Sequence, residues 1–304
     1  MPILITGGAG YIGSHTVKYF QKQNEEIIVV DNMQSGHESS IDVDHLYKID
    51  IRDKSELDKV FKNHNIEAVI HFTANSLVGE SMEQPYEYYH NNVYGMLCLL
   101  DVMKENNVNK IVFSSTAATY GEPKSIPIME SDETSPTNTY GETKLAMEKM
   151  MKWFDQAYGT KYVSLRYFNA AGAYETGEIG EDHHPETHLI PLILQVLLGK
   201  REKIYMFGDD YPTEDGTCVR DYIHVMDLAS AHYKALEYLR KGNDSDIFNL
   251  GNGNGYSVKE VIDATRKVTG HPIPAEVKER RCPLQKLHSE HNITTLWNIQ
   301  LLAG

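Results

Sequence analysis

Short apolar runs alternate with longer amphipathic stretches through the first 170 residues of the chain. The apolar runs are four to six residues long and rich in Ile, Val and aromatic residues, as buried strands are. The stretches between them repeat apolar residues every three or four positions, which is the spacing of an amphipathic helix. Strands are predicted at 3–6, 26–31, 46–50, 68–72, 110–114 and 162–167, and helices at 12–22, 54–63, 86–105 and 140–158. This alternation predicts an α/β fold with a doubly wound parallel sheet.

The pattern changes after Tyr167. Residues 171–188 are rich in Gly, Glu and His and are predicted to form a loop. Beyond it, helices are predicted at 189–199, 226–240 and from the capping residue Ser257 to about 268, and strands at 204–207 and 247–250. We therefore expect a larger domain at 1–170 and a smaller α/β domain at 171–304, whose helices are free to pack back on the first.

The chain of 304 residues carries 29 Lys and Arg against 43 Asp and Glu, a net charge of −14. Such an acidic balance argues against nucleic-acid binding, which depends on basic surfaces. No apolar run is long enough to cross a membrane, and the chain opens without a basic signal-peptide region. We therefore expect a cytoplasmic protein whose three separated cysteines are reduced thiols.

Histidines gather in the stretch "EDHHPETHLIP", at His183, His184 and His188. Pro185 interrupts their spacing, and no pattern of carboxylates and histidines typical of a zinc site accompanies them. A solvated polar loop accounts for this stretch, and no bound metal is expected.

A glycine-rich turn follows the first predicted strand in "ILITGGAGYIGSH". Gly7, Gly10 and Gly13 stand three residues apart, between a strand and a helix. Dinucleotide-binding turns use glycine to turn tightly, to let the backbone touch a pyrophosphate and to pack the helix on the sheet. The free N–H groups of the helix then face the phosphates. The turn predicts a Rossmann-type nucleotide site.

The second predicted strand ends in Asp31, 18 residues after Gly13. A carboxylate at this strand end accepts hydrogen bonds from the ribose hydroxyls of adenosine and repels a 2′-phosphate, so NAD is expected rather than NADP. Asp50 and Ile51, at the end of the third predicted strand, suit the edge and face of an adenine ring.

Tyr140 and Lys144 lie four positions apart at the start of a predicted helix, so their side chains share one face. The Tyr-x-x-x-Lys spacing alone is common, and helix surface is its ordinary explanation. Beside a nucleotide site the pair has a catalytic use, because an ammonium group about 5 Å away favours tyrosinate by about 3 kcal/mol. We therefore expect Lys144 to lower the pKa of Tyr140 and prepare it as a base.

Three hydroxyl residues, Ser114, Ser115 and Thr116, end the predicted strand at 110–114. They fall at the carboxyl edge of the sheet, where doubly wound folds bind ligands. Thr116 is placed to share a proton between a substrate oxygen and Tyr140, although a loop start explains the hydroxyl run equally well when it is taken alone.

Together these residues resemble the extended branch of the short-chain dehydrogenase/reductase superfamily, and within it the UDP-glucose 4-epimerase family. The resemblance covers residues 1 to about 281. Its specific stretches include "HFTANSLVGES", "FSSTAATYGEP", "SPTNTYGETK", "LRYFNAAGA" and above all "GDDYPTEDGTCVRDYIHVMDLASAH".

The resemblance implies roles for particular residues. An NAD pocket would be formed by Gly7, Gly10, Tyr11, Ile12, Gly13, Asp31, Asn32, Asp50, Ile51, Phe72, Asn91, Ser114, Lys144 and Tyr167. Tyr140 would be the catalytic base, assisted by Thr116 and Lys144. Beside Tyr140 and Thr116, a UDP-sugar would be held by Phe168, Asn169, His188, Leu189, Tyr205, Phe207, Arg220 and Arg281. Arg220 offers a two-pronged donor to a diphosphate, and an ion pair with Asp221 is its alternative.

The implied activity is the interconversion of UDP-galactose and UDP-glucose by an NAD-dependent isomerase of galactose metabolism. The sugar would be oxidised at C4, rotated as a 4-keto intermediate and reduced again. A homodimer paired through helices 86–105 and 140–158 is also implied. Ala117 and Ala118 stand where related dehydratases and decarboxylases carry acids, which argues against those reactions.

Three positions depart from the family pattern. Ser76 replaces a frequent lysine near the cofactor phosphates, and His188 replaces a frequent asparagine. After about 281 the sequence loses the family pattern, so the tail is interpreted as truncated or altered. Two alternatives therefore stay open: an epimerase acting also or mainly on UDP-N-acetylhexosamines, and an NAD-binding protein without turnover.

Overall fold

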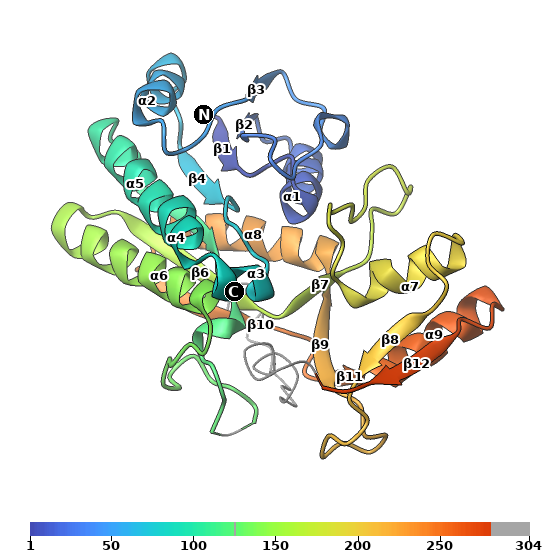
Figure 1. Cartoon of the computed structure of the whole chain (residues 1–304). Coiled ribbons are helices and arrows are strands. Elements are labelled where there is room, and N and C mark those ends of the chain that lie inside the picture. Colours follow the sequence, from blue (N-terminus) through green and yellow to red (C-terminus); the bar gives the residue numbers. More distant parts are fainter. Residues whose placement is uncertain (125, 281–304) are drawn as a thin grey trace.

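The computed structural model describes residues 1–124 and 126–280 of the chain. Its larger part is a seven-stranded sheet covered by helices on both faces (Figure 1). Beside it lie a three-stranded sheet, a two-stranded sheet and the helices α7 (Leu189–Leu197) and α9 (Val258–Thr269). The predicted α/β fold class with a parallel sheet is present in these residues.

The large sheet is parallel throughout, in the order β10-β6-β5-β4-β1-β2-β3. The order reverses between β1 and β4, and doubly wound sheets bind ligands at the carboxyl ends of such neighbouring strands. The strands are β1 (Ile3–Thr6), β2 (Ile27–Val30), β3 (His45–Tyr47), β4 (Ala68–His71), β5 (Lys110–Ser114), β6 (Lys161–Tyr167) and β10 (Asp246–Leu250).

Helices cover both faces of this sheet because its strands are apolar on both sides. On one face lie α1 (Tyr11–Lys22) and α8 (Val225–Arg240), which bury Phe20 and Leu228 against the strands. On the other lie α2 (Lys54–Asn63), α5 (Gly95–Glu105) and α6 (Thr139–Tyr158). Leu57, Leu99 and Met147 from these three helices join one apolar core.

The smaller part has its own apolar cluster, formed by Ile193, Ile204, Ile262 and Ile273. Its three-stranded sheet has the order β11-β9-β7, from β7 (Asn169–Ala171), β9 (Val219–His224) and β11 (Gly255–Ser257). Its two-stranded sheet pairs β8 (Ile204–Phe207) with β12 (Ala275–Lys278) in parallel. β7 follows β6 after a single residue, so this part is connected directly to the carboxyl end of β6, the strand next to the edge strand β10.

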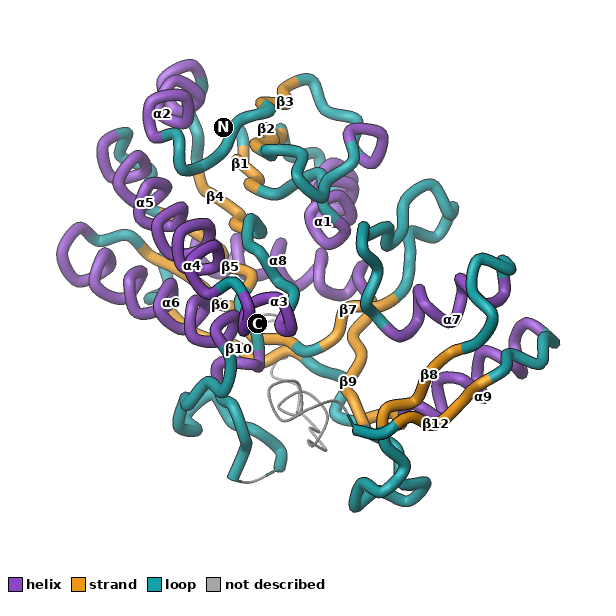
Figure 2. The backbone as a smooth tube through the Cα atoms, viewed as in Figure 1, coloured by secondary structure: helices purple, strands orange, loops and turns teal. Residues whose placement is uncertain are grey.

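Most predicted helices and strands occur within a few residues of their predicted bounds. The predicted helix at 86–105 differs, because it consists of α4 (Pro85–Tyr88), a π-helical turn η2 (Tyr89–Tyr94) and α5 in one continuous rod (Figure 2). Three short elements also escaped prediction: the helix α3 (Val78–Glu83), the 3₁₀ turn η1 (Glu38–Ser40) and the 3₁₀ turn η3 (Ala117–Thr119). Strands β7, β9, β11 and β12 were not predicted either.

Two elements from the second half of the chain belong to the larger sheet. β10 pairs with β6, and α8 packs against α1, where the Tyr19 hydroxyl donates to Ser230 Oγ over 3.1 Å. Arg240 at the end of α8 forms ion pairs with Glu25 and Glu67. The domain division predicted near residue 170 therefore separates the chain by sequence. In the structure, α8 and β10 come after that residue but pack with the larger part.

Among the described residues, no helix combines the length and the apolar character that a membrane span requires.

Gly13 is expected to be intolerant of any side chain. A Cβ there would collide with the carbonyl oxygen of Gly7, whereas a Cβ at Gly10 would meet that oxygen at an ordinary 3.5 Å. We expect Gly13→Ala to lower the free energy of unfolding by about 1–3 kcal/mol through overpacking. Gly10→Ala, the matched control, is expected to change it by less than about 1 kcal/mol. Urea unfolding measures both, and equal losses would contradict the packing argument.

Candidate active site

The glycine turn between β1 and α1 forms a cradle with room only for backbone. Gly7 has φ +73°, and a Cβ on it would lie 2.8 Å from the backbone nitrogen of Thr73. Gly10 caps α1 without a side-chain hydrogen bond, so the first N–H groups of the helix point outward. Such a turn fits a pyrophosphate, which the helix N-terminus attracts.

Asp31 sits buried at the end of β2, beside this turn. Its carboxylate accepts hydrogen bonds from the backbone N–H groups of Ala9, over 3.0 Å, and Met33, over 2.8 Å. Burial raises its pKa, and the two N–H groups act in the opposite direction by stabilising the ionised form. The carboxylate is thereby fixed as an acceptor next to the cradle, as the predicted ribose contact requires.

Asp50 and its neighbours form the next edge of this pocket. Asp50 accepts from Asn32 Nδ2 over 3.3 Å and pairs with Arg52 over 2.6 Å. The hydrogen bonds from Arg52 lower the pKa of Asp50 to about 2, so it stays ionised. Ile51 is buried directly beneath Gly95 of α5.

A polar cavity of about 220 Å³ lies next to these residues, and one predicted cofactor residue, Asn91, reaches it. Arg52 and Asn75 were not predicted from the sequence. Arg52 directly follows the Asp50–Ile51 pair, which is the one sequence signal that points to it. The cavity is lined by Gln34, Arg52, Asn75, Glu80, Gln84, Glu87 and Asn91.

The N-terminus of α6 brings Tyr140 to the end of β5. Asn138 caps this helix by accepting from the Gly141 N–H over 2.8 Å, and the Tyr140 N–H donates to Ser81 Oγ of α3 over 3.1 Å. The side chain of Tyr140 is hydrogen-bonded to that of Thr116. The structure therefore brings together the two hydroxyl residues that the sequence analysis placed in the catalytic group.

Lys144 lies one turn further along α6 and is buried. Its ammonium donates to the carbonyl oxygen of Ser114 over 2.8 Å and lies 4.8 Å from the centre of the Phe113 ring. The same nitrogen is 5.9 Å from the centre of the Tyr140 ring. Lys144 is therefore close to Tyr140, as the i,i+4 spacing predicted.

The pKa values of the pair correct one expectation. Burial raises the pKa of Tyr140 to about 12 against a smaller lowering by Thr116, so in this structure Lys144 does not bring that pKa below its ordinary value. Burial also lowers the pKa of Lys144 to about 7, although the nearby carboxylate of Glu148 raises it. Removal from water is the largest cause of both shifts, because each group loses hydration of its charged form.

The remaining predicted cofactor residues line the same edge of the sheet. Ser114 and Tyr167 share a hydrogen bond of 2.5 Å between their hydroxyls. Phe72, just beyond β4, packs with its ring centre 4.6 Å from that of buried His232. Tyr11 donates to the carbonyl oxygen of Gly172 over 2.6 Å, which ties the glycine turn to the loop after β7.

The residues predicted to hold a sugar nucleotide come mainly from the smaller part. Asn169 on β7 donates to the carbonyl oxygen of Asp221 over 3.1 Å, and Arg220 on β9 donates to that of Val219 over 2.8 Å. Phe168 packs on the apolar cluster around Tyr120. Leu189 begins α7, while Tyr205 and Phe207 lie on β8. Arg281 lies outside the described residues.

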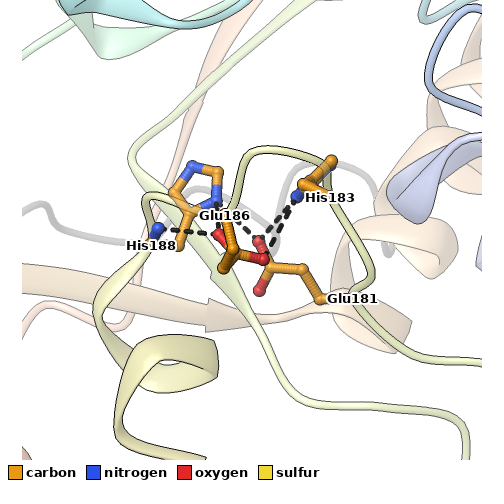
Figure 3. A group of neighbouring side chains, drawn as sticks. All are labelled: Glu181, His183, Glu186 and His188. Atoms are coloured by element: carbon orange, nitrogen blue, oxygen red, sulfur yellow. Dashed lines mark hydrogen bonds and ion pairs between the residues drawn. The ribbon is translucent and has the colours of Figure 1, made fainter. Parts of the chain in front are cut away.

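His188 belongs to an ionic cluster that the sequence analysis did not foresee (Figure 3). Its Nδ1 lies 2.7 Å from Glu181 and 3.2 Å from Glu186, and His183 faces the same two carboxylates. From the sequence no supporting pattern of carboxylates and histidines was expected here, whereas in the structure Glu181 and Glu186 both face these imidazoles. The four candidate ligand atoms lie within 4.8 Å of one another.

The carboxylates hold both imidazoles protonated. Glu181, followed by Glu186, raises the pKa of His183 to about 9 and that of His188 to about 10. A metal ion would have to displace two protons here at neutral pH, which weakens its binding. Two imidazolium–carboxylate pairs account for the cluster, and the absence of a metal stays a prediction.

Comparisons with known proteins place this geometry in a family. The model of the NAD dependent epimerase/dehydratase family matches residues 3–251, which is most of the chain. The chain belongs to this family. The glycine cradle and buried Asp31 agree with its dinucleotide cofactor, and the predicted resemblance and fold class are confirmed.

Several proteins similar to this chain carry the name UDP-glucose 4-epimerase. The UDP-glucose 4-epimerase of Halalkalibacterium halodurans is 65% identical over 92% of this chain and 84% of its own length. A UDP-glucose 4-epimerase structure from Brucella ovis, in complex with NAD, has a TM-score of 0.93 at 41% identity and covers 99% of this chain and 92% of its own. A third, from Bifidobacterium longum with NAD⁺ and UDP, has a TM-score of 0.87 at 42% identity, covering 92% and 87%.

Lys144 is expected to lower stability where it is charged. Its pKa falls from 10.5 to about 7 on folding, so below pH 7 both states are charged and the full burial cost is present. Between about pH 7 and 10 the folded state releases the proton first, and the free energy of unfolding rises with pH. In NAD-free protein at about pH 6, we expect Lys144→Met to raise the free energy of unfolding by about 1–4 kcal/mol. The variant is also expected to lose most of the increase in that free energy between about pH 7 and 10.

The control is Lys149→Met, because Lys149 is exposed on the same helix. Urea unfolding at about pH 6 and about pH 9 compares the two variants with the parent. A Lys144→Met protein that is less stable at about pH 6 and keeps the parent's pH dependence would contradict the argument.

Proposed function

We propose that this chain interconverts UDP-galactose and UDP-glucose with bound NAD. The observation that carries the proposal is that Tyr140, Thr116 and Lys144 come together at the carboxyl edge of the large sheet. The glycine cradle lies at the same edge, after β1. The 65% identity to a UDP-glucose 4-epimerase over 92% of the chain supports the same reaction. UDP-sugars are therefore the substrates, and the chain acts as an isomerase.

The NAD site is proposed to run from the glycine cradle to Lys144. Gly7, Gly10 and Gly13 would accept the pyrophosphate with the start of α1, including Tyr11 and Ile12. Asp31 and Asn32 would bind the adenosine ribose, with Asp50, Ile51 and Asn91 around the adenine. Phe72, Ser114, Lys144 and Tyr167 would surround the nicotinamide end. NAD, when bound, supplies hydride acceptance and return at C4 of the sugar, so that no net oxidation results.

Tyr140 is proposed to remove the proton of the sugar O4 hydroxyl and later to return it. Thr116, hydrogen-bonded to Tyr140, would bridge the two oxygens and keep the proton path short. The raised pKa of Tyr140 makes it a neutral phenol in the unliganded protein, so its ionisation requires added positive charge nearby. Lys144 supplies part of that charge as long as it remains protonated.

The smaller part is proposed to hold the UDP portion of the substrate. Arg220 presents a planar guanidinium suited to a diphosphate, and Tyr205 or Phe207 on β8 suits the face of a uracil ring. Asn169, Phe168, His188 and Leu189 would contact the rest of the sugar nucleotide. The structure of a Bifidobacterium longum relative in complex with NAD⁺ and UDP supports a uridine site in such proteins.

Replacement of Tyr140 tests the reaction. We expect Tyr140→Phe to lower kcat for UDP-galactose by about 10²–10⁴-fold, because it removes the acid–base group. Conversion to UDP-glucose is followed without added NAD. Tyr158→Phe, at the exposed end of the same helix, serves as the control and is expected to keep full activity.

Two results would count against this proposal: a Tyr140→Phe protein as active as its parent, or a parent that binds NAD and never converts UDP-galactose. The same assay with UDP-N-acetylgalactosamine distinguishes an epimerase of broader specificity.

A homodimer through α5 and α6 is the proposed assembly. Exposed apolar residues support it, since Leu97 on α5 is 46% exposed and Trp153 on α6 is 64% exposed. The two helices lie side by side on one face of the molecule (Figure 1). The cytoplasmic location expected from the sequence also stays a prediction.

The variant Leu97→Arg/Trp153→Arg is expected to be monomeric by light scattering, because two buried charges per protomer would oppose the pairing. Val268→Arg is the control, since Val268 is an exposed apolar residue on distant α9. Identical masses for both variants and the parent would contradict an interface on α5 and α6.

A further inference from the structure

Three residues of α6 contact three consecutive residues at the end of β5. Tyr140, Lys144 and Glu148 are four positions apart and share one face of the helix. Tyr140 is hydrogen-bonded to Thr116, Lys144 donates to the carbonyl oxygen of Ser114, and Glu148 accepts from the hydroxyl of Ser115. The first two contacts belong to the proposed catalytic group of Tyr140, Thr116 and Lys144. Glu148 is not a member of that group.

Glu148 is a buried carboxylate that accepts three hydrogen bonds. Its Oε1 accepts from Ser115 Oγ over 2.5 Å and from Arg166 Nε over 3.0 Å, and its Oε2 accepts from Arg166 Nη2 over 2.5 Å. Both side chains of the ion pair are only 4% exposed. A carboxylate held by three donors in a dry site has one position available to it.

Arg166 is itself held by groups from other strands. Its guanidinium lies 4.7 Å from the centre of the Tyr120 ring, and the Tyr120 hydroxyl donates to Asn249 Oδ1 over 2.7 Å. Asn249 belongs to β10, so the support reaches the edge strand of the large sheet. Glu148 therefore joins the catalytic edge to a fixed network rather than to a mobile surface.

Glu148 is also the acid that acts on Lys144. Tyr140 and Glu148 on α6 and His71 on β4 are titratable groups that interact with the ammonium, and Tyr167 on β6 interacts with Tyr140. Among these, Glu148 raises the pKa of Lys144 against the lowering caused by burial. The carboxylate therefore opposes the loss of a proton that the proposed reaction needs.

We propose that Glu148 is a positioning residue for proton transfer, which fixes Ser115 so that Thr116 stays beneath Tyr140 and supplies the negative charge that keeps Lys144 protonated. This inference rests on the proposed function of Tyr140, Thr116 and Lys144. The ion pair with Arg166 fixes the position of Glu148. Its hydrogen bond with Ser115 and the effect of its charge on Lys144 are the two parts of the proposed role.

Glu148→Gln is the first test, because the amide keeps the size and an oxygen for Ser115 but removes the charge. In the NAD-containing enzyme, activity that requires the Lys144 ammonium falls as pH rises through the pKa of Lys144. Without the carboxylate that pKa falls further, so the alkaline limb of the kcat profile is expected to move to lower pH. Above the limb, kcat is expected to fall about tenfold per pH unit of movement, with KM for UDP-galactose unchanged.

Glu142→Gln is the matched control, because Glu142 is an exposed acid in the first turn of the same helix. Its kcat profile is expected to coincide with that of the parent. Glu148→Asp, which keeps the charge, is expected to restore the position of the alkaline limb but only part of kcat, since the shorter side chain reaches Ser115 poorly.

Ser115→Ala tests the positioning half alone. It removes the hydroxyl and leaves the Glu148–Arg166 pair intact, so kcat is expected to fall without any movement of the alkaline limb. Should Glu148→Gln fail to fold with Arg166 unpaired, the double variant Glu148→Gln/Arg166→Gln removes both charges. Its alkaline limb is expected to move in the same direction but less far, because loss of the Arg166 positive charge favours the Lys144 ammonium.

An unmoved alkaline limb in Glu148→Gln, or in the double variant, would overturn the inference. A loss of kcat that is equal at every pH would do so too, because a merely structural ion pair predicts it. These results leave the proposed function standing as long as the parent converts UDP-galactose. Failure of the parent to convert it would instead overturn the proposed function.

Discussion

The packing of α6 on the carboxyl end of β5 is the constraint on which the site depends. A helix presents one residue per turn to a strand, and here three successive turns meet three successive residues of the chain. The close approach is possible because Gly141 faces the backbone of Ala118, where a Cβ would come within 2.6 Å of the carbonyl oxygen. A single small residue at the third position of the helix thus determines whether Tyr140 reaches Thr116.

The energetic cost of this arrangement falls on the buried polar groups. Lys144, Glu148 and Arg166 are all withdrawn from water, and hydrogen bonds of each offset part of that cost, although Arg166 Nη1 is buried without a hydrogen-bond partner. Groups arranged in this way gain little net stability, but they have few alternative positions. The large apolar cores on the two faces of the sheet provide the stability that allows such a cluster to persist.

Sequence reasoning succeeded where the signal was local. The glycine turn, the four-residue spacing of Tyr140 and Lys144 and the long amphipathic helices are all encoded within one short window. It failed where neighbours are distant in sequence: β7 is three residues long and finds its partner β9 about fifty residues later. The raised pKa of Tyr140 was missed for a related reason, because the burial that causes it comes from elements throughout the fold. The glutamates beside His183 and His188 could have been considered from sequence, but their convergence depends on the path of a loop without a periodic pattern.

The position of β10 has a consequence for how the molecule forms. This strand completes the sheet by pairing with β6 after an excursion of roughly eighty residues through the smaller part, and α8 covers α1 across more than two hundred. Contacts of such long range are slow to close, since the loop entropy is lost before the pairing is gained. During synthesis the nucleotide-binding half therefore emerges with an uncovered apolar face and an open edge at β6. Its sheet is complete only after residue 250 has been synthesised, because β10 ends there. Chaperone contact or misassembly is therefore expected mainly in the interval before that point.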